Sequence, residues 1–156
     1  MLFISPSKGR MPFQAMMKDI LEFINLAPED NYRVIIGSDS QVHHETCFVS
    51  AVVVHRVGKG ARYFYHKKQQ RKITSLRQRI FYETALSLEL ASQVVAVLAD
   101  NGYGDLNVEI HLDVGDKGET KELIKEVVGM VVGSGFDAHI KPDSSGASKV
   151  ADKYTK

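Results

Sequence analysis

The sequence predicts a single α/β domain over residues 1–156, built on a mixed β-sheet of five strands. A chain of 156 residues is the size of one domain. Apolar residues make up 44% and charged residues 25%, a globular balance that excludes wholesale disorder and a small disulfide scaffold. Three strand-like segments follow one another in the first half, whereas helices and strands alternate in the second half. This order favours an antiparallel meander followed by two parallel strands that are reached through helices.

The first half of the chain predicts one helix and three strands. Residues 12–26 carry apolar side chains at spacings of three and four, which is typical of an amphipathic helix. Residues 1–30 are therefore expected to form an N-terminal helical extension. The turn signal Gly58-Lys59-Gly60 joins the last two of the following strands as a hairpin. The three strands are expected at residues 33–39, 47–57 and 61–68.

The second half alternates helices with short strands. Ser75 is a typical N-cap residue and Asn101-Gly102 a typical stop signal, so a long helix is expected over residues 75–99. The remaining elements are expected, in chain order, as a strand at 107–113, a helix at 119–133, a strand at 136–141 and a terminal helix at 145–155.

Charge is segregated along the chain, although the net charge is only +1. Residues 47–82 contain nine basic residues and no Asp or Glu, so this segment carries +9 and the rest of the chain −8. A long segment of one sign attracts polyanions such as nucleic acid. The alternative is a solvated face that only keeps the protein soluble. The residues expected to bind a nucleic-acid substrate are Lys67, Lys68, Arg71, Lys72 and Arg79.

The cysteine content and the apolar runs indicate a compartment. Cys47 is the single cysteine, which excludes an intrachain disulfide. No apolar run approaches the roughly 18 residues that suggest a membrane span, and the first residues lack the apolar core of a signal peptide. We therefore expect a cytoplasmic protein with no membrane partner.

Two aspartates stand at the ends of predicted strands. Asp39 ends the first strand and Asp113 ends the fourth, so both side chains would reach the same carboxyl edge if these strands are parallel neighbours. Two acids held close together repel one another unless a cation or a proton lies between them. The alternative is that each aspartate caps a strand end by bonding to turn amides.

Glu83 lies on the apolar stripe of the long predicted helix, where it is the only charged member. A carboxylate on a core-facing stripe costs free energy unless it is paired or bound to metal. The alternative to a metal ligand is a buried salt bridge, for example with Arg79. His111 shares a strand face with Asp113 and is expected to be an ordinary core or surface histidine.

A fourth acid is expected from the C-terminal segment, either Asp143 or Asp152. Asp152 follows small residues that would let a helix lie close over the carboxyl edge of the sheet. Asp143 lies in Pro142-Asp143-Ser144-Ser145, where turn formation alone explains it. Asp152 is the preferred candidate.

Three or four carboxylates at one sheet edge are hard oxygen ligands, which select Mg²⁺ or Mn²⁺ over zinc. Two such ions about 3.5–4 Å apart would bridge a scissile phosphate. One ion would activate water for in-line attack and the other would stabilise the leaving oxygen. Together with the basic segment, the acids predict a phosphodiesterase that acts on nucleic acid.

Three short motifs carry a resemblance to a known family: Gly37-Ser38-Asp39-Ser40-Gln41, Phe81-Tyr82-Glu83-Thr84-Ala85 and His111-Leu112-Asp113-Val114-Gly115. In this order they resemble the ribonuclease H-like superfamily. Over essentially its full length the chain resembles the YkuK-type family of bacterial proteins, through GSDSQ, LIKEVVGMVVGSGF, IKPDS and VADKYTK. The resemblance implies strand order 3-2-1-4-5 with helices on both faces, and hydrolysis that leaves a 5′-phosphate and a 3′-hydroxyl. It also implies a metal site of four acids: Asp39, Glu83, Asp113 and Asp152.

The leading interpretation is a divalent-metal-dependent nuclease that hydrolyses phosphodiester bonds by a two-metal mechanism. A second interpretation is a catalytically inactive ribonuclease H-like module that binds nucleic acid and uses the acids to cap turns. A third is an interaction subunit whose basic face meets an acidic protein. The expected partner is RNA, DNA or a hybrid of the two, and no oligomeric state is predicted.

Overall fold

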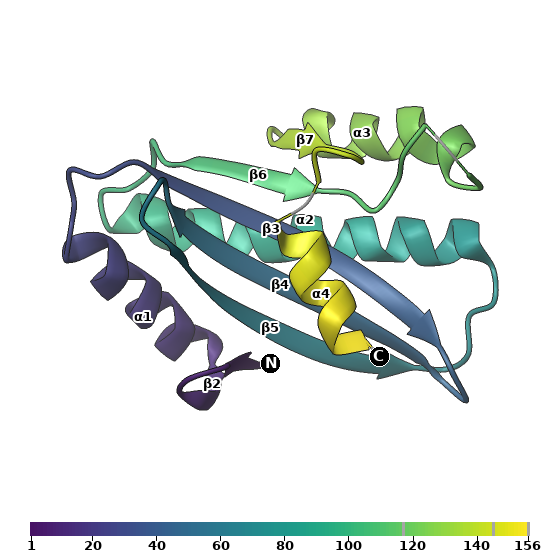
Figure 1. Cartoon of the computed structure of the whole chain (residues 1–156), viewed down its shortest axis with the longest axis horizontal. Helices are drawn as coiled ribbons and strands as arrows, with labels where there is room; N and C mark the ends of the chain where they lie inside the picture. The colour runs from purple at the N-terminus through teal and green to yellow at the C-terminus, as the bar shows by residue number, and fades with distance from the viewer. Residues whose placement is uncertain (117, 145, 156) are drawn as a thin grey trace.

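A computed structural model describes residues 1–116, 118–144 and 146–155, and for residues 148 and 149 the backbone alone. The described residues form seven strands, β1 (Leu2–Ser5), β2 (Gly9–Pro12), β3 (Tyr32–Val42), β4 (Thr46–Arg56), β5 (Ala61–Gln70), β6 (Asn107–His111) and β7 (Asp137–His139). They make one mixed sheet in the order β2-β1-β5-β4-β3-β6-β7 (Figure 1). The sheet therefore has seven strands, two more than the five predicted.

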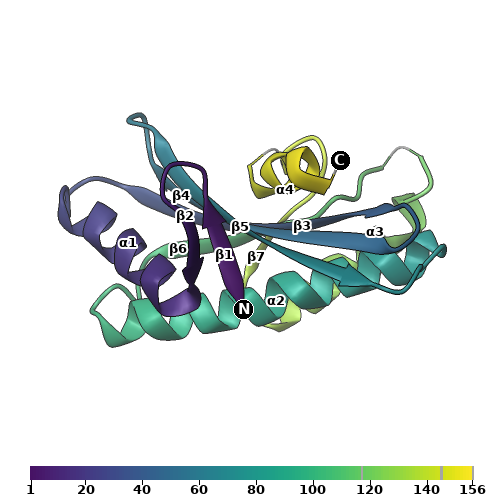
Figure 2. The same ribbon diagram turned by 90° about the horizontal axis from the view of Figure 1, so that it is seen from below.

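Helices cover both faces of this sheet. They are α1 (Phe13–Asn25), α2 (Leu76–Asp100), α3 (Ile124–Gly133), which follows the 3₁₀ turn η1 (Lys121–Leu123), and α4 (Ala147–Thr155). Figure 2 shows α4 alone on one face, while α1 and α2 lie on the other. Residues of α3 pack in the same core as those of α1 and α2. The two faces are called below the α4 face and the α2 face.

The three central strands are long and antiparallel. β3 and β4 carry apolar side chains on both faces of the sheet: the pair Ile36–Val52 packs on the α2 face and the pair Ile35–Val53 on the α4 face. This is typical of strands that are buried on both sides. β3 runs to Val42, beyond the predicted end at residue 39. The prediction ended early because Ser38 and Ser40 look like turn residues, whereas both are buried strand residues with hydroxyl partners on the α2 face.

β6 is parallel to β3 and shorter than predicted. The last pair between the two strands is Gly37 with His111, so β6 ends two residues before Asp113. β3 continues past this point, paired with β4 alone. The two strands therefore separate where Asp39 and Asp113 follow, and this separation leaves room for side chains from either face.

The N-terminal segment differs from the predicted helical extension. Residues 2–12 form the hairpin β1–β2, and β1 pairs with β5 through Ile4 and Tyr65. Gly9, with a φ of 78°, closes the turn in a conformation that glycine adopts without strain. Strands of four residues are too short to show periodicity, so only α1 was visible in the sequence.

Two cores lie on the two faces of the sheet. The larger one packs α1, α2 and α3 against the α2 face, and the smaller one packs Ala147 and Ala151 of α4 against the other. α2 is long and apolar enough to cross a membrane by length and composition alone. In the structure it packs along the sheet, and Ile80, Leu90 and Val94 are among the residues it buries there.

Candidate metal centre

Three acidic side chains meet where β3 and β6 separate. Asp39 comes from β3, Asp113 from the segment directly after β6, and Glu83 from α2. One carboxylate oxygen from each lies within 4.8 Å of the other two. Asp39 and Glu83 are 7% and 5% exposed, whereas Asp113 is half-buried. The structure thus brings together three of the predicted site residues.

The alternation of β3 explains how acids from both faces reach one place. Ser38 and Ser40 point to the α2 face, because their hydroxyls bond to Ser87 and Glu83. Asp39 lies between them and therefore points to the α4 face. Since β6 has ended at this level, Glu83 approaches from the α2 face and meets Asp39 through the opening.

Asp152 joins this group from α4. Its carboxyl group forms a hydrogen bond with Asp39. Two ionised carboxylates only accept hydrogen bonds, so this contact requires a proton on one of the two acids. Asp143, the other candidate, is exposed in the turn after β7, where its backbone N–H donates to the Ile140 carbonyl at 2.7 Å. The structure therefore places Asp152, and not Asp143, against the acidic cluster.

The electrostatics of the cluster show a shortage of positive charge. Burial and the charge of Asp113 raise the pKa of Asp39 to about 7. Its hydrogen bonds with Asp152 and Asp113 act in the same direction, against a backbone hydrogen bond from Ser40. Burial also raises the pKa of Glu83 well above its ordinary value. In both groups the ionised form is disfavoured, as expected for acids that lie close together with too little counter-charge.

Ser40 and Arg79 lie beside Glu83 on the α2 face. The Ser40 hydroxyl donates to Glu83 Oε2 at 2.5 Å, and Arg79 Nη1 donates to the same hydroxyl at 3.3 Å. Both groups act to lower the pKa of Glu83, although burial outweighs them. Arg79, predicted to bind substrate, is half-buried at the edge of the cluster, and its Nε is a buried donor with no partner among the described residues.

A lysine that the sequence analysis missed lies on the other side of the cluster. Lys141 Nζ is 2.7 Å from Asp113 Oδ1, and its backbone N–H donates to the Val114 carbonyl at 2.8 Å. Lys141 ends a predicted strand and lies in the IKPDS stretch, but nothing in that stretch assigned the lysine a role at the acidic cluster. One signal was available: Lys141 follows β7 as Asp113 follows β6, and neighbouring parallel strands end at the same edge of the sheet.

The nine basic residues between 47 and 82 do not form a single face. Four of them, Arg56, Lys59, Arg62 and Arg77, make ion pairs with acids elsewhere in the chain. The predicted substrate-binding residues Lys67, Lys68, Arg71 and Lys72 are exposed, and Lys68 donates to the Tyr82 hydroxyl at 2.7 Å. The free positive charge is thus concentrated at the end of β5 and in the segment before α2.

Lys67 has a defined relation to Asp39. Asp39 pairs with Val49 across β3 and β4, and Val49 pairs with Lys67 across β4 and β5. Directly paired residues share a face of the sheet, so Lys67 and Asp39 both point to the α4 face. Two strand spacings of about 4.8 Å put their backbones roughly 10 Å apart.

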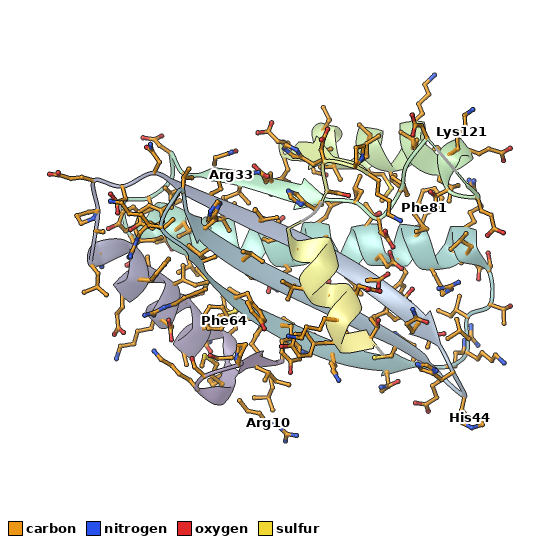
Figure 3. The ribbon with its side chains drawn as sticks, in the orientation of Figure 1. Arg10, Arg33, His44, Phe64, Phe81 and Lys121 are labelled. Atoms are coloured by element: carbon orange, nitrogen blue, oxygen red, sulfur yellow. The ribbon has the colours of Figure 1, made fainter. Side chains whose placement is uncertain are left out.

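A second group of possible ligands, Glu109, His111 and His139, lies further back along β6. One atom from each also falls within 4.8 Å of the others. Arg33 lies beside β6 near the start of β3 (Figure 3) and its guanidinium bonds to both oxygens of Glu109. Asn107 Nδ2 donates to Glu109 Oε2 at 3.1 Å. The negative charge of Glu109 is therefore balanced by the chain itself.

The hydrogen bonds of His111 fix its tautomer. The backbone N–H of Gly146 donates to Nδ1 at 3.1 Å, so the ring proton is on Nε2, which donates to Glu109 Oε1 at 2.8 Å. Neither nitrogen is then available to a metal. Because Gly146 directly precedes α4, the bond also anchors the start of that helix on β6.

Tyr154 anchors the other end of α4. Its ring stacks on that of Tyr65 with centroids 3.7 Å apart, and its hydroxyl is 2.8 Å from that of Tyr63. Between the two anchors, the small side chains of Ala147 and Ala151 pack in the core. Asp152 is carried by a helix that is held at both ends.

The chemistry of the acidic cluster fits a divalent metal ion. All of its potential ligands are carboxylate oxygens, the donors preferred by Mg²⁺ and Mn²⁺. The raised pKa of Asp39 indicates too little positive charge among these acids, and a bound cation would supply it. The site therefore suits a hard cation, in contrast to the balanced Glu109 group.

Comparisons with known proteins assign the chain to a family. A family model described as Ribonuclease H-like matches residues 15–156. The chain is 40% identical over 167 residues to "Uncharacterized protein YkuK" of Bacillus subtilis (strain 168), an alignment that covers 99% of this chain and 97% of that protein. No solved structure gives a significant match.

Proposed function

The chain belongs to the ribonuclease H-like family, and on this premise we propose that it is a divalent-metal-dependent nuclease. The observation that carries the proposal is the convergence of Asp39, Glu83 and Asp113, with Asp152 hydrogen-bonded to Asp39. Structural acids are normally balanced by the chain, as Glu109 is. The acids of this cluster instead have raised pKa values, which is typical of a functional site.

Asp39, Glu83, Asp113 and Asp152 would hold Mg²⁺ or Mn²⁺. A bound divalent ion of this kind supplies a Lewis acid that activates water and stabilises the leaving oxygen of a phosphodiester. The chain's own contribution is to hold the acids in place: β3 and α2 bury Asp39 and Glu83, and Ser40 orients Glu83 by donating to one of its oxygens.

The free basic residues would bind the phosphate backbone of the substrate. Lys67 shares the α4 face with Asp39, and Arg71 and Lys72 are exposed just beyond the end of β5. Arg79 lies beside Ser40 and Glu83, with a buried Nε that has no partner among the described residues. A nucleic acid that crosses the end of β5 would reach the acids with its backbone neutralised on the way.

The test is a panel of labelled single-stranded, duplex and hybrid RNA and DNA substrates incubated with Mn²⁺. The wild type is expected to cleave at least one substrate. Asp39→Asn and Asp113→Asn are expected to abolish cleavage while the proteins stay folded, because each removes a metal ligand. Asp105→Asn is the matched control, since Asp105 is exposed and lies outside the cluster. Unchanged cleavage by either cluster variant would contradict the proposal, and binding without cleavage would identify an inactive module.

A further inference from the structure

We propose that Lys141 is a resident counter-cation of the acidic cluster, which competes with the divalent ion for Asp113 and so sets the metal affinity of the site. This inference rests on the proposed function, because it concerns the same four acids. It assigns a positioning and affinity-setting role to a residue outside the acidic ligand set.

Three contacts put the Lys141 ammonium at the cluster. Its Nζ is 2.7 Å from Asp113 Oδ1, and its backbone N–H is held by the Val114 carbonyl. Its stem lies against Gly115, where an added Cβ would be only 3.0 Å from the Cβ of Lys141. Any larger residue at position 115 would push the stem away. The approach of the lysine is thus built into the segment after β6.

The charges around the cluster give Lys141 its effect. Arg79 supplies positive charge on the α2 side, next to Ser40 and Glu83. Lys141 supplies it on the opposite side, at Asp113. The hydrogen bond to Asp113 raises the pKa of Lys141, and the charges of Asp113, Asp39 and Asp152 add to this effect. The ammonium therefore stays charged while it interacts with three of the four acids.

A metal ion that binds Asp113 must compete with this ammonium. A cation at Asp113 would be repelled by Lys141 and would have to displace it from Oδ1. Displacement is sterically open, because the Lys141 side chain is 57% exposed and its flexible stem can turn into solvent. Lys141 thus keeps the metal-free cluster partly neutralised at the expense of metal affinity.

The test measures Mn²⁺ binding to the full chain by calorimetry at low ionic strength, with no substrate present. Lys141→Met is expected to bind Mn²⁺ about tenfold more tightly than the wild type. Lys141→Arg keeps the charge and should stay near the wild-type affinity. Lys125→Met is the matched control, because it removes an exposed lysine from α3 and tests for a mere change in net charge.

The advantage of Lys141→Met should also shrink as salt is added, because screening weakens the repulsion that it removes. Mn²⁺ binding by Lys141→Met that equals or is weaker than wild-type binding would overturn this inference alone. Absence of Mn²⁺ binding in both proteins would overturn the proposed function as well. Thermal unfolding of each variant confirms that the compared proteins are folded.

Discussion

The Glu109–His111–His139 group comes from β6 and β7, and the Asp39–Glu83–Asp113 cluster lies just beyond the end of β6, where β3 and β6 separate. Each places three potential ligand atoms within 4.8 Å of one another. In the first group Arg33 balances Glu109, and both nitrogens of His111 are used. In the second, burial and the charge of Asp113 raise the pKa of Asp39, because the acids lie close together with too little counter-charge. Counter-charge, rather than the mere gathering of ligand residues, therefore separates a structural network from a candidate metal site.

This contrast predicts opposite effects for one chemical change made in each cluster. Glu109→Gln is expected to lower the free energy of unfolding by about 2–3 kcal/mol, because Arg33 loses its charged partner. Glu109→Gln should still gain melting temperature when Mn²⁺ is added, because its acidic cluster is intact. Glu83→Gln is expected to leave the metal-free protein as stable as the wild type, because it removes a disfavoured buried charge, and to abolish the Mn²⁺ effect.

Thermal unfolding with and without Mn²⁺ measures both quantities in each variant. Asp105→Asn serves again as the control for a substitution outside both clusters. A Mn²⁺ effect that disappears in Glu109→Gln and persists in Glu83→Gln would reverse the assignment of the two clusters.

The two clusters are also expected to respond to pH in opposite directions. The pKa of Asp39 is raised from 3.8 to about 7, so the native state holds a proton that the unfolded state releases. The extra proton on Asp39 stabilises the native state of the metal-free protein at low pH. Its contribution to the free energy of unfolding falls as pH rises from about 4 to about 7. Burial alone would raise the pKa of Glu109, but hydrogen bonds from Arg33 and His111 lower it overall. The contribution of the ionised Glu109 carboxylate to the free energy of unfolding is therefore lost as pH falls.

Denaturant unfolding of the metal-free protein between pH 4 and pH 8 measures the first effect. It appears as the difference between the wild type and Asp39→Asn, which lacks the titrating group. Mn²⁺ should stabilise the wild type more at pH 8 than at pH 5, because binding at the lower pH must expel the proton. A pH profile identical in the two proteins would show that Asp39 has no raised pKa.

The smallest expected effect concerns the anchor of α4, which links the two clusters. Tyr154→Phe removes the hydroxyl contact with Tyr63 and keeps the stacking on Tyr65. We expect a loss of about 1 kcal/mol in the free energy of unfolding and slightly weaker Mn²⁺ binding, because Asp152 is held less firmly. A calorimetric titration checks the second effect, and tighter Mn²⁺ binding in the variant would mean that α4 opposes the metal.

Much of the fold was predictable because its periodic elements are long. The stripe of α2 made Glu83 conspicuous as a charge among apolar residues, and Ser75 caps that helix by accepting from the Gln78 backbone. The hairpin β1–β2 escaped prediction because strands of four residues carry little pattern. The end of β3 was placed too early because its buried serines resemble turn residues.

The site residues easiest to predict were those that broke an apolar pattern or ended a predicted strand. Asp39, Asp113 and Glu83 met one of these conditions. Lys141 also ends a predicted strand, but its importance depends on a contact with Asp113 that only the folded chain creates. The role of Glu109 depends likewise on Arg33, which is 76 residues away in sequence.

The most direct test of a metal site at the four acids is a crystal of the full chain soaked in Mn²⁺, with the ion located by anomalous scattering. We expect anomalous density among Asp39, Glu83, Asp113 and Asp152, with the Lys141 ammonium moved away from Asp113 and no density beside Glu109. Density beside Glu109 and the two histidines, or none among the four acids, would contradict it.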